Sequence, residues 1–172
     1  AGLNRAYSGI IMTALTEHAV AHDATACKAS RHARVQQLIT ADETSLIELE
    51  TLIATLPICS TGRVFIEVPD ASYVFDLAVP ARMIVTWLDR SQRTGDPGTG
   101  RSCTPGQALA RAVTAWSDEM LCADDTCAGG TRIHLLGGFL GTADIFDHLT
   151  GALGIEAAAV ETPERFGLAV SR

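Results

Sequence analysis

Polar side chains that could bind a phosphate group follow the first predicted strand. Residues 42–45 lie between an apolar run at 34–41 and a helical pattern. Their backbone N–H groups, with the Thr44 and Ser45 hydroxyls, could therefore donate to a phosphate at a helix start. The carboxylates of Asp42 and Glu43 would repel that ligand. Acidic residues also stabilise the positive end of a helix dipole, and by themselves these residues favour that structural interpretation.

Arginines follow the third predicted strand. Arg90 and Arg93 lie in a loop rich in glycine at 89–105, and guanidinium groups can bind a 2′-phosphate or a pyrophosphate bidentately, with Arg101 as a third candidate. The alternative is a solvated loop whose arginines offset an acidic surface. Trp87 could stack on an adenine or nicotinamide ring, although an aromatic side chain within a buried strand is more commonly part of the core.

A third candidate is the turn Gly137-Gly138-Phe139-Leu140-Gly141. Glycines at this turn would let a ligand approach the backbone at a helix start. A tight turn from strand to helix also needs glycine for steric reasons, which is the competing interpretation. The sequence has no Gly-x-Ser-x-Gly turn and no phosphate-binding loop of the Walker type, so serine hydrolases and P-loop enzymes are disfavoured.

The cysteines and histidines do not predict a metal site. The five cysteines form no Cys-x-x-Cys pair and have no histidine at zinc-ligand spacing. A disulfide between Cys122 and Cys127 is geometrically conceivable, but reduced thiols are expected in a cytoplasmic protein. His18 and His22 are interpreted as a surface pair on a helix, and His134 as a structural residue of a strand.

Alternating strands and helices must position these candidates. Strands are predicted at 34–41, 63–69, 83–88, 132–136 and 155–160, and helices at 46–56, 105–122 and 142–153. The pattern predicts an α/β fold: a three-layer, doubly wound, mostly parallel sheet of about five strands. In such sheets ligands bind beyond the carboxyl ends of the strands, where the three candidate turns lie.

The chain is expected to form a single domain overall. Residues 1–33 are predicted to hold an amphipathic helix and a linker, and residues 34–172 the α/β domain. The formal charge of −7 argues against nucleic acid or an acidic membrane surface as a partner. The sequence has no apolar run of the roughly 18 to 20 residues that span a bilayer, so a cytoplasmic protein is expected.

Three ordered motifs carry a family resemblance. Asp42-Glu43-Thr44, Val64-Phe65-Ile66-Glu67-Val68-Pro69-Asp70-Ala71 and Val85-Thr86-Trp87-Leu88-Asp89-Arg90 resemble segments of the siderophore-interacting protein family. The match is to the C-terminal NAD(P)H-binding domain of these flavin-dependent ferric-siderophore reductases. The resemblance implies a ferredoxin-reductase-like domain that binds NADPH or NADH. The implied cofactor-binding residues are Asp42, Glu43, Thr44, Ser45, Trp87, Arg90, Arg93, Gly137 and Gly138.

The chain also departs from the family pattern. Ala41 replaces a glycine, Ile47 a proline and Asp89 a histidine, and Phe139 stands where the family has an acidic residue. We expect no FAD-binding barrel like that of the family in this sequence, because too few residues precede the domain. Residues 5–8 match its Arg-x-Tyr-Ser motif only within a helical pattern, so FAD is not expected to bind this chain alone.

Two hypotheses about function follow. The first is an NAD(P)H-dependent oxidoreductase module that acts in siderophore-iron utilisation with a separate flavoprotein. The second is a non-catalytic binding or assembly domain that kept the fold and lost the cofactors. In that second case, the N-terminal helix would cover the surface of the absent barrel or mediate a homodimer. An open basic cleft at the carboxyl edge would favour the first hypothesis, and a cleft filled by side chains the second.

Overall fold

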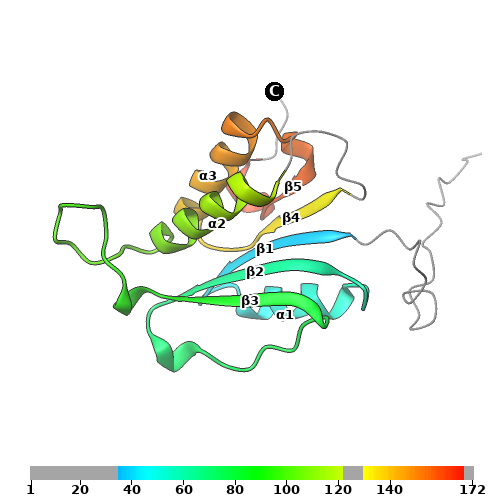
Figure 1. Cartoon of the computed structure of the whole chain (residues 1–172), viewed down its shortest axis with the longest axis horizontal. Coiled ribbons are helices and arrows are strands. Elements are labelled where there is room, and N and C mark those ends of the chain that lie inside the picture. Colours follow the sequence, from blue (N-terminus) through cyan, green and yellow to red (C-terminus); the bar gives the residue numbers. More distant parts are fainter. Residues whose placement is uncertain (1–34, 122–129, 169–172) are drawn as a thin grey trace, which may run out of the picture.

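The computed structural model of the chain describes residues 35–121 and 130–168, which form an α/β domain (Figure 1). Its five-stranded sheet has the order β3-β2-β1-β4-β5, and every pair of neighbours is parallel. The strands are β1 (Gln36–Asp42), β2 (Thr61–Val68), β3 (Arg82–Asp89), β4 (Thr131–Leu135) and β5 (Val160–Glu161). This confirms the predicted parallel sheet.

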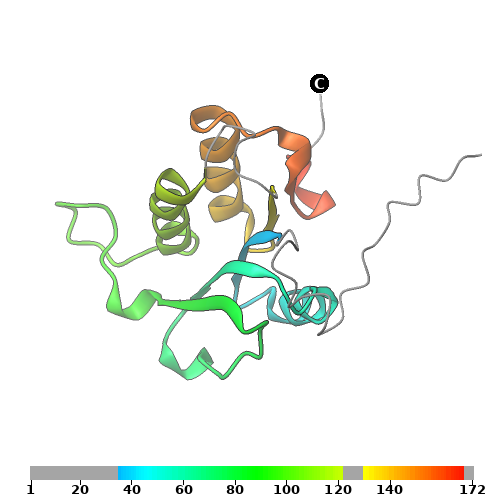
Figure 2. The same ribbon diagram turned by 45° about the vertical axis from the view of Figure 1, so that its right-hand side comes forward.

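Helices cover both faces of the sheet, as Figures 1 and 2 show. Helix α1 (Leu46–Thr55) packs on one face, and α2 (Gln107–Met120) and α3 (Phe139–Asp147) pack on the other. A π-helical turn, His148–Ala152, continues α3. Two apolar cores result, one on each side of the sheet, so the domain has three layers.

Strand β1 lies at the centre of the sheet because it is apolar on both sides. Leu38 belongs to the core beneath α2 and α3, whereas Ile39 belongs to the core beneath α1, and both are fully buried. A continuous apolar run of this kind is typical of a parallel strand covered on both faces. Ile39 is in register with Val64 of β2 and His134 of β4.

The link between β2 and β3 contains no α-helix, as the sequence predicted. It consists of a short 3₁₀ helix, Ala71–Tyr73, followed by an irregular segment that returns to the start of β3. Phe75 of this segment packs edge-on against Trp87, with ring centroids 5.2 Å apart. Trp87 is therefore half-buried on the α1 side of the sheet.

Several element boundaries differ from the sequence prediction, and two of them have a clear structural reason. Helix α2 begins at Gln107 because Gly106 adopts a left-handed conformation with φ of 86°, so Pro105 precedes the helix. Helix α3 begins at Phe139, three residues before the predicted start. The fifth strand is only Val160–Glu161, because Ala157–Ala159 form a 3₁₀ turn.

Several predictions lie outside the described residues. These are the N-terminal helix and linker, the pair His18 and His22, and a disulfide between Cys122 and Cys127. Within residues 35–121 and 130–168, no helix is both long enough and apolar enough to cross a membrane.

A close backbone contact joins the starts of α2 and α3. A Cβ atom at Gly141 would lie 2.8 Å from the Cα of Gly106, closer than any normal contact. Gly141→Ala should therefore lower the free energy of unfolding by about 1–3 kcal/mol, although alanine is the better helix former. Urea unfolding would measure this change. Gly151→Ala is the matched control, since a Cβ there meets nothing within 4 Å, and a similar loss in both variants would contradict the explanation.

Candidate functional site at the carboxyl edge

The strand order reverses between β1 and β4. From β1 the chain adds β2 and β3 on one side, and β4 and β5 then follow on the other. A doubly wound sheet has its crevice at this point, beyond the carboxyl ends of the strands. The turns after β1 and β4 flank this point, so the predicted residues Asp42 and Gly138 meet there.

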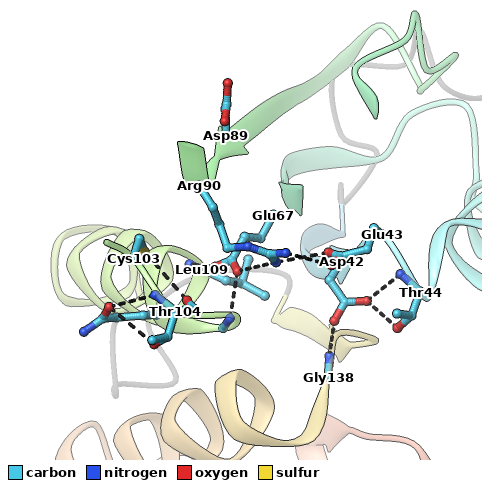
Figure 3. Close-up of polar contacts among 12 residues, drawn as sticks. Asp42, Glu43, Thr44, Glu67, Asp89, Arg90, Cys103, Thr104, Leu109 and Gly138 are labelled. Atoms are coloured by element: carbon cyan, nitrogen blue, oxygen red, sulfur yellow. Dashed lines mark hydrogen bonds and ion pairs between the residues drawn. The ribbon is translucent and has the colours of Figure 1, made fainter. Parts of the chain in front are cut away.

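Asp42 joins the turns after β1 and β4 (Figure 3). Its Oδ1 accepts hydrogen bonds from the backbone N–H of Thr44 at 2.9 Å and from the Thr44 hydroxyl at 2.7 Å. Its Oδ2 accepts the N–H of Gly138 at 2.6 Å. Gly138 is the N-cap residue of α3, so a carboxylate of the protein holds an N–H group that an anionic ligand would otherwise use.

Glu67 occupies the start of α2 in the same way. Its side chain is fully buried. Its Oε1 accepts the N–H of Gly106, and its Oε2 accepts the N–H of Leu109, both at 2.7 Å. The helix dipole adds to these bonds, because a negative charge at the N-terminus is favourable. The left-handed Gly106 gives the chain the bend that leads into this helix start.

Arg90 is the cation that pairs with two carboxylates at this edge. One guanidinium nitrogen lies 3.0 Å from Glu67, and the other lies 2.9 Å from Glu43 (Figure 3). The hydrogen bond with Glu43 is the main reason that the pKa of Arg90 is raised above its ordinary value. Its side chain is only 13% exposed, so Arg90 is neither a free phosphate ligand nor part of a solvated loop.

Asp89 positions Arg90. The Asp89 carboxylate accepts the N–H of Ser91 at 2.8 Å and its hydroxyl at 2.7 Å, which caps the short 3₁₀ helix Arg90–Gln92. The departure from the family's histidine therefore provides a local cap at the end of β3. We call the set Asp42, Glu43, Glu67 and Arg90 the acid–arginine network.

The remaining predicted site residues are distributed along the same edge. Thr44 is exposed, whereas Ser45 is buried, and its hydroxyl accepts the N–H of Asp42 at 3.0 Å. Gly137 is buried and Gly138 exposed. Arg93 is exposed and lies just beyond the 3₁₀ helix, outside the acid–arginine network. The structure thus brings Asp42, Glu43, Arg90 and Gly138 together and leaves Arg93 apart.

Arg93 lines a polar pocket of about 470 Å³ between the residues after β3 and helix α2. The lining residues are Gln92, Arg93, Thr94, Ala108, Arg111 and Ala112. Two arginines therefore line this pocket, and its lining contains no carboxylate. Arg111 is fixed in place, because it donates to the carbonyl oxygens of Thr94 at 2.8 Å and Gly95 at 3.1 Å. We call this the arginine pocket.

The sequence patterns do not mark two residues of this candidate site, Glu67 and Arg111. Glu67 belongs to one of the family motifs, but a carboxylate within a buried apolar strand must have partners and is itself a signal. Nothing in the sequence marks Arg111, because the loop residues that it contacts, Thr94 and Gly95, come next to it only in the folded chain. Among the described residues, no group of three or more metal-ligating side chains could hold a metal ion.

The fold and this edge define a doubly wound α/β domain with its switch point between β1 and β4. The model for siderophore-interacting proteins matches residues 34–123, just over half of the chain. The chain belongs to the siderophore-interacting protein family. No curated protein sequence matches it.

Solved structures support the fold. The siderophore-interacting protein SipS from Aeromonas hydrophila is 17% identical, with a TM-score of 0.54 over 76% of this chain and 50% of that protein. A siderophore utilization protein from T. fusca is 22% identical, with a TM-score of 0.52 over 74% of this chain and 42% of that protein. The chain therefore spans half or less of the length of these two relatives.

The acid–arginine network should be a structural requirement. Removing its cation would leave buried Glu67 without a charge partner, so Arg90→Ala should lower the free energy of unfolding by about 3 kcal/mol. Arg93→Ala removes an exposed arginine three residues away and should change it by less than about 0.5 kcal/mol. Chemical denaturation of both variants would test this, and equal stability of the two would contradict a structural role for Arg90.

Proposed function

We propose that this chain acts in siderophore-iron utilisation as the nicotinamide-nucleotide-binding domain of a ferric-siderophore reductase. Membership of the siderophore-interacting protein family supports the process, and the parallel sheet with its switch point supports the type of domain. The chain covers half or less of the two similar solved proteins, which supports a flavin held elsewhere, by a further domain or a separate flavoprotein.

The arginine pocket carries the proposal. A phosphate or pyrophosphate needs cationic donors that are not already paired with carboxylates, and the planar fork of an arginine suits that ligand. The residues of the switch point do not fit it, because Asp42 holds the Gly138 N–H and two carboxylates hold Arg90. Arg93 and Arg111 do fit a phosphate ligand, since their pocket is open and no carboxylate lines it.

The residues of this chain would bind and orient the nucleotide. Arg93 would hold a phosphate group. Arg111 is fixed by two carbonyl oxygens, and its remaining N–H groups would donate to the same phosphate. The acid–arginine network would keep the carboxyl ends of the strands rigid beside it. When bound, NADPH or NADH would supply a hydride to a flavin, which in turn reduces the siderophore-bound ferric iron.

A second candidate function is a binding or assembly domain without a nucleotide. The switch point favours this function, because the Gly138 N–H and Arg90 are already bonded to carboxylates of the protein. Exposed apolar side chains in the first turns of α1 and α3 also favour it. Ile47 is 81% exposed and Leu140 70% exposed, beside the exposed ring of Phe139. Exposed apolar side chains of this size suit a protein partner or a homodimer.

Calorimetric titration with NADPH and NADH distinguishes the two functions. We expect 1:1 binding that Arg93→Ala weakens about tenfold, the loss expected for one charge-assisted hydrogen bond. Arg132→Ala is the matched control, because Arg132 is also exposed but lies near the amino end of β4. Arg90→Ala is unsuitable, since it would alter stability and binding together.

The opposite result would overturn the nucleotide proposal. If the folded chain releases no binding heat with either nucleotide, the arginine pocket is not a phosphate site. The assembly function would then be tested by light scattering, where a dimer that dissociates on Leu140→Asp would support it. An equal loss of affinity in Arg93→Ala and Arg132→Ala would assign the binding to net charge alone.

A further inference from the structure

Strand β3 forms an open edge of the sheet. It pairs with β2 on one side, and no other strand of the described domain lies beside it (Figure 1). Across residues 84–88, no backbone group of β3 bonds to any described residue outside β2. An edge of this kind presents a row of N–H and C=O groups to which a further strand can bond.

The sequence of β3 lacks the features that usually protect an edge strand. Proteins block such edges with charged side chains, proline, bulges or very short strands. The other edge of this sheet is protected, because β5 has only two residues and Pro163 follows it closely. Residues 83–88 read Met-Ile-Val-Thr-Trp-Leu, with no charge, no proline and three β-branched side chains. This composition favours strand pairing.

Ile84 shows that the edge is also open on one face. Side chains alternate along a strand, so Ile84 lies on the same face as Leu88, which belongs to the core beneath α2 and α3. Leu88 is only 2% exposed, whereas Ile84 is 55% exposed. Helices α2 and α3 therefore do not cover the amino half of β3, and a neighbouring strand would remove apolar surface from water there.

We propose that β3 pairs with β3 of a second copy of this chain, in antiparallel orientation, so that the two sheets join into one. The charges at the ends of the strand favour this partner. Arg82 and Asp89 are the first and last residues of β3. Antiparallel pairing brings the arginine end of each copy to the aspartate end of the other, whereas parallel pairing would bring the two arginines together.

Twofold symmetry lets a single contact close both open edges. Opposite residues in an antiparallel pair point to the same face, so the symmetry axis passes beside one residue of the strand. A register centred on Val85 sets Ile84 opposite the partner's Thr86 and Met83 opposite the partner's Trp87. Pairs of β-branched, aliphatic and aromatic side chains stabilise neighbouring strands. This pairing does not rest on the proposed nucleotide function, and it differs from a dimer formed through Leu140 at the start of α3.

Sedimentation of the full chain over a range of concentrations tests the pairing. We expect a monomer–dimer equilibrium in the micromolar range. Ile84→Lys should weaken dimerisation about tenfold or more, because lysine on an edge strand opposes pairing. Ile58→Lys is the matched control: Ile58 is also 55% exposed, but it lies between α1 and β2, and this change should leave the dimer intact.

Hydrogen exchange of the unmodified chain locates the contact without any substitution. Amides within residues 84–88 should exchange more slowly at concentrations where the dimer predominates, and amides of α1 should not change. The proposal would be overturned by a chain that stays monomeric up to about 1 mM. Three further results would also overturn it: an equal loss in Ile84→Lys and Ile58→Lys, a dimer that dissociates on Leu140→Asp, or dimerisation without slower exchange in β3.

Discussion

A buried carboxylate, Glu67, sets the conditions that the carboxyl edge must meet. Moving an ionised group out of water costs several kcal/mol unless it is paired and hydrogen-bonded. Glu67 is fully buried, and it receives two backbone N–H groups from the start of α2 and one guanidinium nitrogen from Arg90. Strand β3 and helix α2 must therefore end and begin where these donors reach the carboxylate.

Three residues of the motifs that carry the family resemblance are, in this structure, bonded to one another. Arg90 of the third motif pairs with Glu43 of the first and Glu67 of the second, and Asp42 of the first motif bonds beside them to Gly138. Together these residues form the acid–arginine network. Such a network positions strand ends and helix starts. It is weak evidence for a ligand, because its donors and acceptors are already used. The family motifs thus mark residues that hold strand ends and helix starts together. A nucleotide would have to bind to other residues beside them.

The sequence predicted most of the fold, because burial imposes simple patterns. Apolar strands such as β1 and β2, with amphipathic helices between them, were recognisable, and so was the α-helix-free link before β3. The fifth strand was overestimated, since an alanine-rich run fits a strand and a 3₁₀ turn equally well.

The candidate site was predicted less well. Pattern reasoning found Asp42, Arg90 and Gly138, but it could not assign their partners. Each contact joins residues that are distant in the chain, and only the strand order brings them together. The arginine pocket shows the same limit: Arg111 lies on α2, and its role depends on the carbonyl oxygens of Thr94 and Gly95, 16 or 17 residues earlier.

The sequence separation of the network also bears on how the domain folds. The bonds of the network span 39 residues from Glu67 to Gly106, 47 from Glu43 to Arg90 and 96 from Asp42 to Gly138. Closing such long loops costs conformational entropy before any contact repays it. The carboxyl edge is thus expected to assemble late, after the local β–α units have formed. The bond between Asp42 and Gly138 can form only when β4 joins the sheet. The carboxyl edge is therefore complete only after all four strands from β1 to β4 have assembled.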